Sequence, residues 1–129
     1  MDQPQFVTVD DRSVRHRVLG NRGEPVVMVH GFGGSLETWA ANQAALASAG
    51  YTVAALDLPG HGESSLDVGT GSLDELAATV LAYMDAAGIE RAHLVGHSMG
   101  AAVCLALADQ RPARVRSLTL VGPAGLGQK

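Results

Sequence analysis

The stretch Gly96-His97-Ser98-Met99-Gly100 decides the fold of this chain, because it places one serine midway between two glycines. The apolar run at 92–95 before it is typical of a buried strand, and the small apolar residues at 101–108 are typical of a helix. A strand, a G-x-S-x-G segment and a helix in this order predict a sharp, strained turn that carries the serine out of the sheet. Glycine is expected at both flanking positions, since a Cβ at either would collide with the neighbouring strand or helix.

The rest of the chain alternates between apolar runs of strand length and segments with helical periodicity. This alternation predicts an α/β fold, in which a mostly parallel sheet carries helices on both faces and the crossovers are right-handed. The expected strands are Gln5–Val9, Ser13–Leu19, Pro25–Val29, Thr52–Leu56, Ala92–Val95 and Val115–Val121. The expected helices run from a cap at Ser35 to about Ala49, from a capping box of Ser72 and Glu75 to Gly88, and from Ser98 to about Gln110.

Four loops that follow predicted strands are rich in glycine and polar residues. They are the segment 30–34, the segment 57–64, the turn at Ser98 and the segment 122–125. In a parallel sheet the carboxyl ends of the strands meet at one edge, and ligands bind there. We therefore expect these loops to form a single site.

Ser98 is the candidate nucleophile of that site. Acyl transfer through serine needs a nucleophile, a base that takes its proton, and donors for the oxyanion. The expected donors are the backbone N–H of Met99, which follows the serine, and that of Phe32 in the glycine-rich loop. The alternative, in which Ser98 only fills a tight turn, is disfavoured by the strand and helix around it. Supporting roles are expected for His30, Gly31, Gly33, Gly96, His97 and Gly100.

Metal and nucleotide sites are not expected. His93 and His97 have the spacing of a zinc-binding helix, but Leu94 stands where the glutamate belongs, and the segment is a strand followed by a turn. The G-x-G at 31–33 lacks the third glycine of a dinucleotide fingerprint, and no Lys-Ser/Thr pair follows any glycine loop. We therefore predict neither a metal nor a cofactor, and we expect His93 to be a core histidine.

The composition narrows the possible partners and the compartment. The 129 residues carry a net charge of −4, with 9 basic against 13 acidic side chains, which disfavours a nucleic-acid partner. No secretory signal is visible at 1–5, and the longest apolar stretch, 99–108, is far shorter than the roughly 20 residues of a membrane span. The single cysteine, Cys104, fits a reducing compartment. We expect a cytoplasmic protein with no membrane partner.

Three motifs together resemble those of the α/β-hydrolase superfamily, in the same order along nearly the whole chain. His30-Gly31-Phe32-Gly33-Gly34-Ser35 resembles the oxyanion segment, residues 57–64 resemble the D-x-P-G-x-G-x-S loop, and Gly96–Gly100 resembles the nucleophile elbow. More narrowly, residues 72–77 and 122–127 are similar to the hydrolase-fold acyltransferase subunits of acetoin dehydrogenase complexes. The resemblance implies one partial domain over residues 1–129, truncated after about the sixth strand and lacking the cap.

The triad base and acid are not found in this sequence. The family places both after the serine, whereas no histidine follows Ser98, and the one later acid, Asp109, lies at the far end of a predicted helix. Asp57 precedes the serine and is expected to brace its loop. His61 is expected to order the same loop, and His16 to lie in the N-terminal hairpin, away from the site.

These observations favour an esterase-like serine hydrolase that acts on a small-molecule ester, thioester or related acyl substrate, and that is inactive as this chain alone. Two alternatives remain open. One is a non-catalytic interaction module with a hydrolase fold, and the other is an acyltransferase subunit of a dehydrogenase complex. The strand Val115–Val121 is expected to form an open sheet edge through which the chain self-associates.

Overall fold

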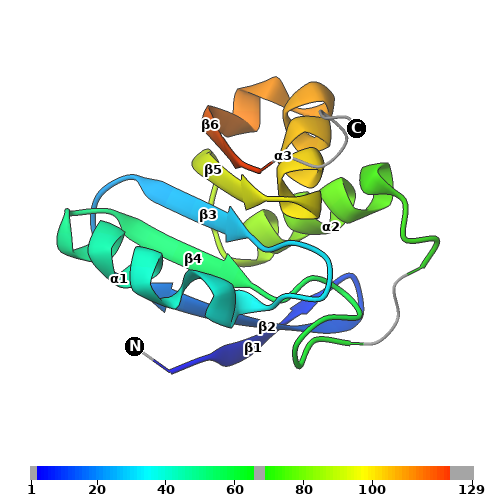
Figure 1. Ribbon diagram of the computed structural model, residues 1–129, viewed down its shortest axis with the longest axis horizontal. Helices are drawn as coiled ribbons and strands as arrows, with labels where there is room; N and C mark the ends of the chain where they lie inside the picture. The colour runs from blue at the N-terminus through cyan, green and yellow to red at the C-terminus, as the bar shows by residue number, and fades with distance from the viewer. Residues whose placement is uncertain (1–2, 66–68, 123–129) are drawn as a thin grey trace.

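In the computed structural model, which describes residues 3–65 and 69–122, six strands form one sheet in the order β1-β2-β4-β3-β5-β6 (Figure 1). Strands β3 to β6 run parallel, and β2 runs antiparallel to both β1 and β4. The strands are β1 (Gln5–Val9), β2 (Arg12–Leu19), β3 (Pro25–Val29), β4 (Thr52–Leu56), β5 (Ala92–His97) and β6 (Val115–Val121). The predicted α/β architecture is confirmed.

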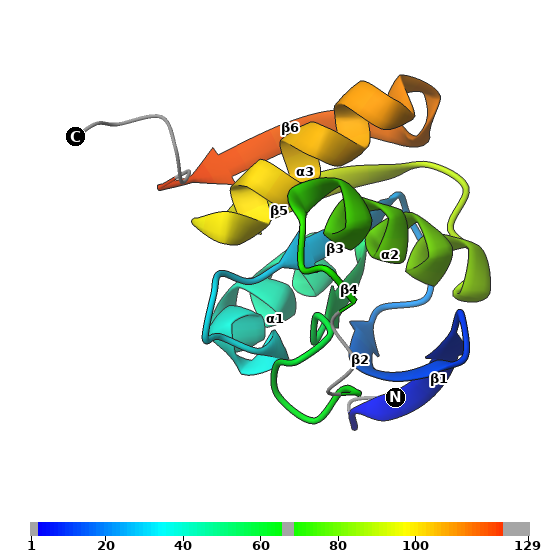
Figure 2. The ribbon, with the colours of Figure 1, turned by 90° about the vertical axis from the view of Figure 1, so that its right-hand side faces the viewer.

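Helices cover both faces of the sheet (Figures 1 and 2). They are α1 (Ala40–Ser48), α2 (Leu73–Ala86) and α3 (Met99–Gln110), with 3₁₀ turns η1 (Leu36–Trp39) and η2 (Pro112–Arg114). The buried side chains divide accordingly. A small cluster that includes Met28 and Trp39 lies on the α1 side, and a larger one that includes Leu94, Tyr83 and Leu107 lies under α2 and α3.

Local sequence explains why the elements begin and end where they do. Asp10 and Asp11 adopt φ values of +50° and +64°, as a two-residue hairpin turn requires, so that Val9 pairs with Arg12. At the start of α2, the side chain of Ser72 accepts a hydrogen bond from the Glu75 N–H at 3.1 Å. Gly88 ends the same helix with φ +73°.

The capping box is only half formed, which corrects the sequence prediction. The Glu75 carboxylate accepts from the N–H groups of Thr70 and Gly71, at 2.6 and 3.3 Å, rather than from that of Ser72. Gly71 has φ +72°, so the preceding turn folds back over the helix start and brings these two amides within reach.

Strand β5 also differs from its predicted end at Val95. It continues through His97, which pairs with Val121 of β6, because the parallel ladder persists up to the serine turn itself. The segment after Ser35 begins with the 3₁₀ turn η1 before α1 starts. The predicted segment 122–125 lies outside the described residues except for Gly122.

Two histidines lie in surroundings that differ from those predicted. His16 is not isolated, since its Nδ1 lies 2.6 Å from the Tyr83 hydroxyl, and burial lowers its pKa. The alternation along β2 turns its ring towards α2, and sequence spacing alone does not show this. His93 is half-buried rather than in the core, and its two nitrogens contact Ser117 and Glu24 at 2.7 Å each. Its ring meets that of Tyr51, which follows α1, edge to face at 6.0 Å, and this face of β5 is only partly covered.

Within residues 3–65 and 69–122, no helix is both long and apolar enough to cross a membrane. The sheet ends on one side at β6, whose outer edge has no strand partner among those residues. At the other side it ends at β1, which is shorter, with five residues against the seven of β6.

We expect the 129-residue chain, expressed alone, to form concentration-dependent dimers through β6. Thr119 is exposed on β6, so Thr119→Lys should add a charge to this edge without disturbing the core and return the chain to a monomer. Sedimentation velocity measures the distribution. The matched control is Thr8→Lys, on the other edge strand. A dimer that Thr8→Lys dissociates and Thr119→Lys does not would assign the association to β1 instead.

Candidate functional site

The turn at Ser98 connects β5 to α3 with a strained backbone. Ser98 has φ +57° and ψ −118°, a conformation that residues other than glycine rarely adopt. Hydrogen bonds hold it from both sides, since the Ser98 N–H donates to the Val121 carbonyl at 3.0 Å and the Ala101 N–H donates to the Ser98 carbonyl at 3.0 Å. The predicted sharp, strained turn is confirmed.

The two flanking glycines are required by space. A Cβ built on Gly100 would lie 2.1 Å from the Val29 carbonyl oxygen and 2.5 Å from that of His30. A Cβ on Gly96 would lie 2.5 Å from the Gly100 carbonyl oxygen. All three obstacles are backbone atoms, which cannot rotate away, so the collisions expected from the sequence are confirmed.

The glycine-rich loop after β3 lies directly against this turn. The Gly34 N–H donates to the Gly31 carbonyl at 2.9 Å, and Gly33 has φ +80°, so residues 31–34 form a tight turn. A Cβ built on Gly31 would lie 3.0 Å from the Cβ of Ser98. The structure thus brings the two segments together, at the edge towards which β3, β4 and β5 point in Figure 1.

A hollow of about 250 Å³ lies between the two segments, lined by Gly31, Phe32, Gly33, Gly34, Thr38, His97 and Ser98. Met99 is the first residue of α3, so helix geometry leaves its N–H without an intrahelical acceptor. The helix also directs its positive end at this hollow, which favours a developing negative charge there. A larger hollow of about 560 Å³ lies between α1 and β2, but it is lined mostly by small residues, and its lining places no histidine or carboxylate beside its one hydroxyl, that of Ser48.

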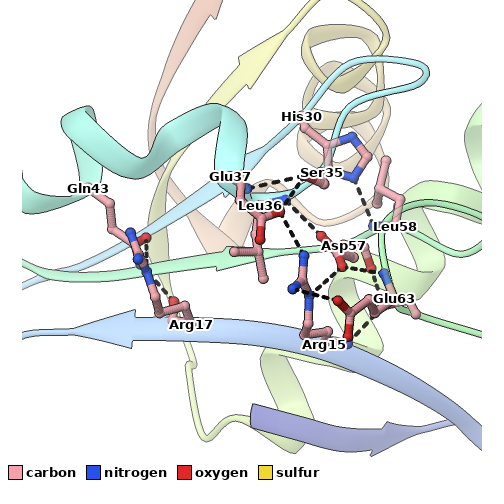
Figure 3. Close-up of polar contacts among 11 residues, drawn as sticks. Arg15, Arg17, His30, Ser35, Leu36, Glu37, Gln43, Asp57, Leu58 and Glu63 are labelled. Carbon is pink, nitrogen blue, oxygen red and sulfur yellow. Dashed lines mark hydrogen bonds and ion pairs between the residues drawn. The ribbon is translucent and has the colours of Figure 1, made fainter. Parts of the chain in front are cut away.

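The ring of His30 joins the loop after β3 to the loop after β4. The Leu58 N–H donates to its Nε2 at 3.0 Å (Figure 3), so that nitrogen is the acceptor. Nδ1 therefore carries the proton, which it donates to the Gly31 carbonyl at 2.7 Å. The ring is fully buried, and burial lowers its pKa. His30 is therefore neutral and has the bracing contacts expected from the sequence.

Asp57 joins the same two loops through its carboxylate, which is completely buried. Its Oδ1 accepts from the Leu36 N–H at 2.7 Å, and its Oδ2 accepts from the Glu63 N–H at 2.8 Å (Figure 3). Gly62 has φ +53°, and a Cβ there would lie 2.1 Å from Oδ2, so the loop can wrap the carboxylate only with glycine at this position. The expected bracing role of Asp57 is confirmed.

Arg15 of β2 is the residue that sequence reasoning missed. Its side chain lies against Asp57, with Nε donating to Oδ2 at 2.8 Å. A charged residue in a predicted strand, followed by a histidine, gives no sign of which partner it will meet 42 residues later.

Aromatic rings line the rim of the site. The ring of His61 lies 4.9 Å from that of His30 and 5.6 Å from that of Phe32, which it meets edge to face. His61 Nδ1 also contacts the Pro59 carbonyl at 3.1 Å, so it orders its own loop as expected. Phe32 is 83% exposed, an unusual position for a large apolar side chain, and it stands beside the hollow.

Within residues 3–65 and 69–122, no side chain forms a hydrogen bond with the Ser98 hydroxyl, and no three His, Cys, Asp or Glu side chains gather as a metal site. Cys104 is fully buried in α3, and burial raises the pKa of its thiol to about 12, so it carries no thiolate at neutral pH.

The sequence profile of the alpha/beta hydrolase fold family matches residues 24–128. The chain belongs to the α/β-hydrolase family. Its mostly parallel sheet with helices on both faces is thus the fold of this family, as the sequence resemblance predicted.

Two relatives illustrate what the chain is similar to in sequence. The chain is 53% identical over 126 residues to a "dihydrolipoyllysine-residue acetyltransferase component of acetoin cleaving system" from Pseudomonas putida, a match that covers 97% of this chain and 34% of that protein. It is 44% identical over 113 residues to a 2-hydroxy-6-oxononadienedioate/2-hydroxy-6-oxononatrienedioate hydrolase from Burkholderia vietnamiensis, which covers 84% of this chain and 39% of that protein.

Among solved structures, an enol-lactonase from Burkholderia xenovorans LB400 matches with a TM-score of 0.83 and 30% identity, over 88% of this chain and 45% of that one. The similarity to these α/β-hydrolases thus extends over most of the present chain. The chain itself spans between about a third and two fifths of the length of the two curated relatives named above.

We expect Gly100→Ala to destabilise the fold by about 2 to 3 kcal/mol, because its methyl group would overlap the carbonyl of Val29. Gly33→Ala is the matched control. Its added methyl meets nothing within 4 Å and is opposed only by the positive φ, so it should cost about 1 kcal/mol. Urea unfolding measures both, and equal losses would contradict the close approach of α3 to β3.

The buried, neutral His30 makes stability depend on pH. Since its pKa in the folded state lies below the ordinary value of 6.5, the unfolded chain binds a proton first, and stability should fall as the pH drops below about 6.5. Burial lowers the pKa of His16 as well, so its contribution to stability also falls as the pH drops. The carboxylates with a lowered pKa, Glu24, Glu37 and Glu75, do not interfere between pH 6.5 and 5, because their ordinary value is 4.5.

His30→Gln should reduce the decrease in the urea midpoint of unfolding between pH 7 and pH 5. The decrease that remains should come from His16, and adding His16→Gln should remove that part too. The measurement is urea unfolding at four pH values. A slope that neither substitution changes would show that both imidazoles are charged in the folded protein.

Proposed function

We propose that Ser98 is the nucleophile of an acyl-transfer reaction on a small-molecule ester, thioester or related acyl substrate. One observation carries the proposal. A serine held at φ +57° directly follows β5 and lines a 250 Å³ hollow opposite the turn 31–34. The strain of such a position has no structural use that a glycine would not serve better, and strain of this kind gathers at functional sites.

The chemistry assigns a role to each part of the hollow. The Ser98 oxygen attacks the substrate carbonyl carbon while a base removes the serine proton, and the carbonyl oxygen becomes an oxyanion. The N–H groups of Phe32 and Met99 donate to that oxyanion. Collapse expels the alcohol or thiol, which takes the proton, and leaves an acyl-serine that a second acceptor then attacks.

In this proposal the base and its orienting acid are not supplied by these 129 residues, since every histidine of the sequence precedes Ser98, whereas the family places both groups after the serine. His97 is exposed beside the serine, but it lies on the strand side of the elbow and is assigned a supporting role, with His30, Gly31, Gly33, Gly96 and Gly100. We expect the 129-residue chain alone to be inactive for the same reason.

The second acceptor separates two candidate functions. Hydrolase relatives favour water as the acceptor. The relative at 53% identity carries the name of a dihydrolipoyllysine-residue acetyltransferase component, which favours a thiol acceptor and a subunit of a larger complex. A non-catalytic interaction module is the remaining alternative, and it predicts no dependence of any reaction on Ser98. We further propose a cytoplasmic protein without a nucleic-acid or membrane partner, on the strength of the composition and its net charge of −4.

Ser98→Ala should abolish covalent labelling of the full-length gene product by a fluorophosphonate probe, because the probe bonds to the activated serine oxygen. Ser48→Ala, at the exposed end of α1, is the matched control and should be labelled like the wild type. Intact-mass spectrometry after labelling reads the result. No labelling of the wild type, or labelling that survives Ser98→Ala, would refute the proposal.

The division of the acyl group between water and a thiol acceptor distinguishes a hydrolase from an acyltransferase. The full-length gene product is given acetyl-CoA or a phenyl ester, with and without dihydrolipoamide. A transferase should form acetyl-dihydrolipoamide faster than it releases acetate, and a hydrolase should release acetate at the same rate whether or not the dithiol is present.

A further inference from the structure

We propose that Arg15 of β2 is a positioning residue for the oxyanion loop: its guanidinium holds the loops after β3 and β4 in the arrangement that the Phe32 N–H requires. The inference rests on the proposed function only for its activity measurement. Its structural part concerns an ion-pair cluster, centred on the buried Arg15 and Asp57, that contains none of the hollow's lining residues.

The guanidinium of Arg15 contacts three carboxylates that come from both loops (Figure 3). Its Nε donates to Asp57 at 2.8 Å, its Nη2 donates to Glu37 at 2.7 Å, and its Nη1 lies 3.4 Å from Glu63. Only 8% of the Arg15 side chain is exposed, whereas Glu37 and Glu63 are mostly exposed, at 60% and 68%. One planar guanidinium thus binds to residues of both loops. Its several N–H donors, fixed in a fork, allow it to contact several carboxylates at once.

Arg15 is also fixed in place by its own backbone. Its carbonyl accepts from the Asp57 N–H at 2.9 Å, and its N–H donates to the Ser64 hydroxyl at 2.8 Å. That hydroxyl in turn donates to the Asp57 carbonyl at 2.8 Å. Because main-chain bonds hold Arg15 in register, a substitution of its side chain removes the guanidinium contacts and leaves the strand pairing intact.

The cluster reaches the oxyanion loop through Leu36. The carboxylate that Arg15 holds accepts the Leu36 N–H, which opens η1, and Ser35 caps η1 while its hydroxyl donates to Glu37 at 2.6 Å. The turn 31–34 ends one residue before Ser35, so no flexible segment separates the cluster from Phe32. A shift of Asp57 is thereby passed to the Phe32 N–H.

Charge balance explains why an arginine is needed. Asp57 is entirely buried, and a buried carboxylate without a cation is strongly disfavoured. Burial opposes the charge on Arg15, but the hydrogen bonds and charges of Asp57 and Glu37 outweigh it and raise the pKa of the guanidinium. Hydrogen bonding to Ser35, together with Arg15, lowers the pKa of Glu37, so this pair stays ionised over the working pH range.

The test compares Arg15→Met, Arg15→Lys and the control Arg17→Met in the full-length gene product. Arg17 lies on the same strand, but its Nε donates to the side chain of Gln43 in α1 at 3.1 Å, away from the loops (Figure 3). Per active site titrated with the phosphonate, Arg15→Met should lower kcat by about tenfold to a hundredfold, because it displaces an oxyanion donor. KM should change less than twofold, since ground-state binding does not use that donor.

Arg15→Lys keeps the charge but loses the fork, so its kcat should fall between those of Arg15→Met and the wild type. Arg17→Met should leave kcat unchanged. A second readout needs no activity. Hydrogen exchange at the Leu36 and Glu63 amides, which donate to Asp57, should quicken at least about tenfold in Arg15→Met and not in Arg17→Met, because the carboxylate that protects them loses its anchor.

Should Arg15→Met fail to fold, Glu37→Gln replaces it, since Glu37 is mostly exposed and its loss removes one arm of the cluster. Its kcat and the exchange at Leu36 should move in the same direction by a smaller factor. Unchanged exchange at both amides in a folded Arg15 variant overturns the inference, as does a loss of kcat that Arg17→Met shares. If the wild type neither labels nor turns over substrate while the exchange responds as expected, the proposed function fails and the bracing by Arg15 stands.

Discussion

The close approach of α3 to β3 is the constraint on which the rest of the structure depends. Only a bare glycine backbone at position 100 lets the first turn of the helix lie against the carbonyls of Val29 and His30. That contact fixes where the helix begins, and hence the abrupt change of direction at Ser98. The strain at Ser98 is local, but the packing that maintains it extends into the centre of the sheet, where β3 and β4 are buried on both faces.

The elbow and the loops are stabilised by different forces. The elbow is held by close packing that leaves no room for a Cβ at either glycine. This packing involves only neighbours within a few residues or across one strand pair. The loops after β3 and β4 are held by polar groups shielded from water, His30 and Asp57, each of which bridges the two loops. Such buried polar contacts are strong when every partner is present and costly when one is missing. They give the loops one arrangement in place of many.

Sequence patterns predicted the fold closely and the site in part. The positions of the six strands and the ends of α1 and α2 shortly before Gly50 and Gly88 follow from short-range rules of periodicity and punctuation, as does the end of α3 at Gln110, so a single sequence is enough to place them. The bracing role of Asp57 was also expected, since loop position and glycine spacing suggest it. Arg15 was not, because its contact with Asp57 joins residues 42 positions apart in the chain, and nothing in a single sequence pairs them. The same holds for His16 and Tyr83, which are 67 positions apart.

The buried thiol in α3 bears on how an acyl group would move through this protein. Thioesters exchange readily with any thiolate they meet, and a stray thiolate near the site would compete with the serine oxygen for the acyl carbon. Cys104 is the only cysteine of the chain and is sealed in the core with its pKa raised to about 12. No alternative sulfur carrier is therefore available on these residues, and an activated acyl group that enters the hollow meets oxygen chemistry alone.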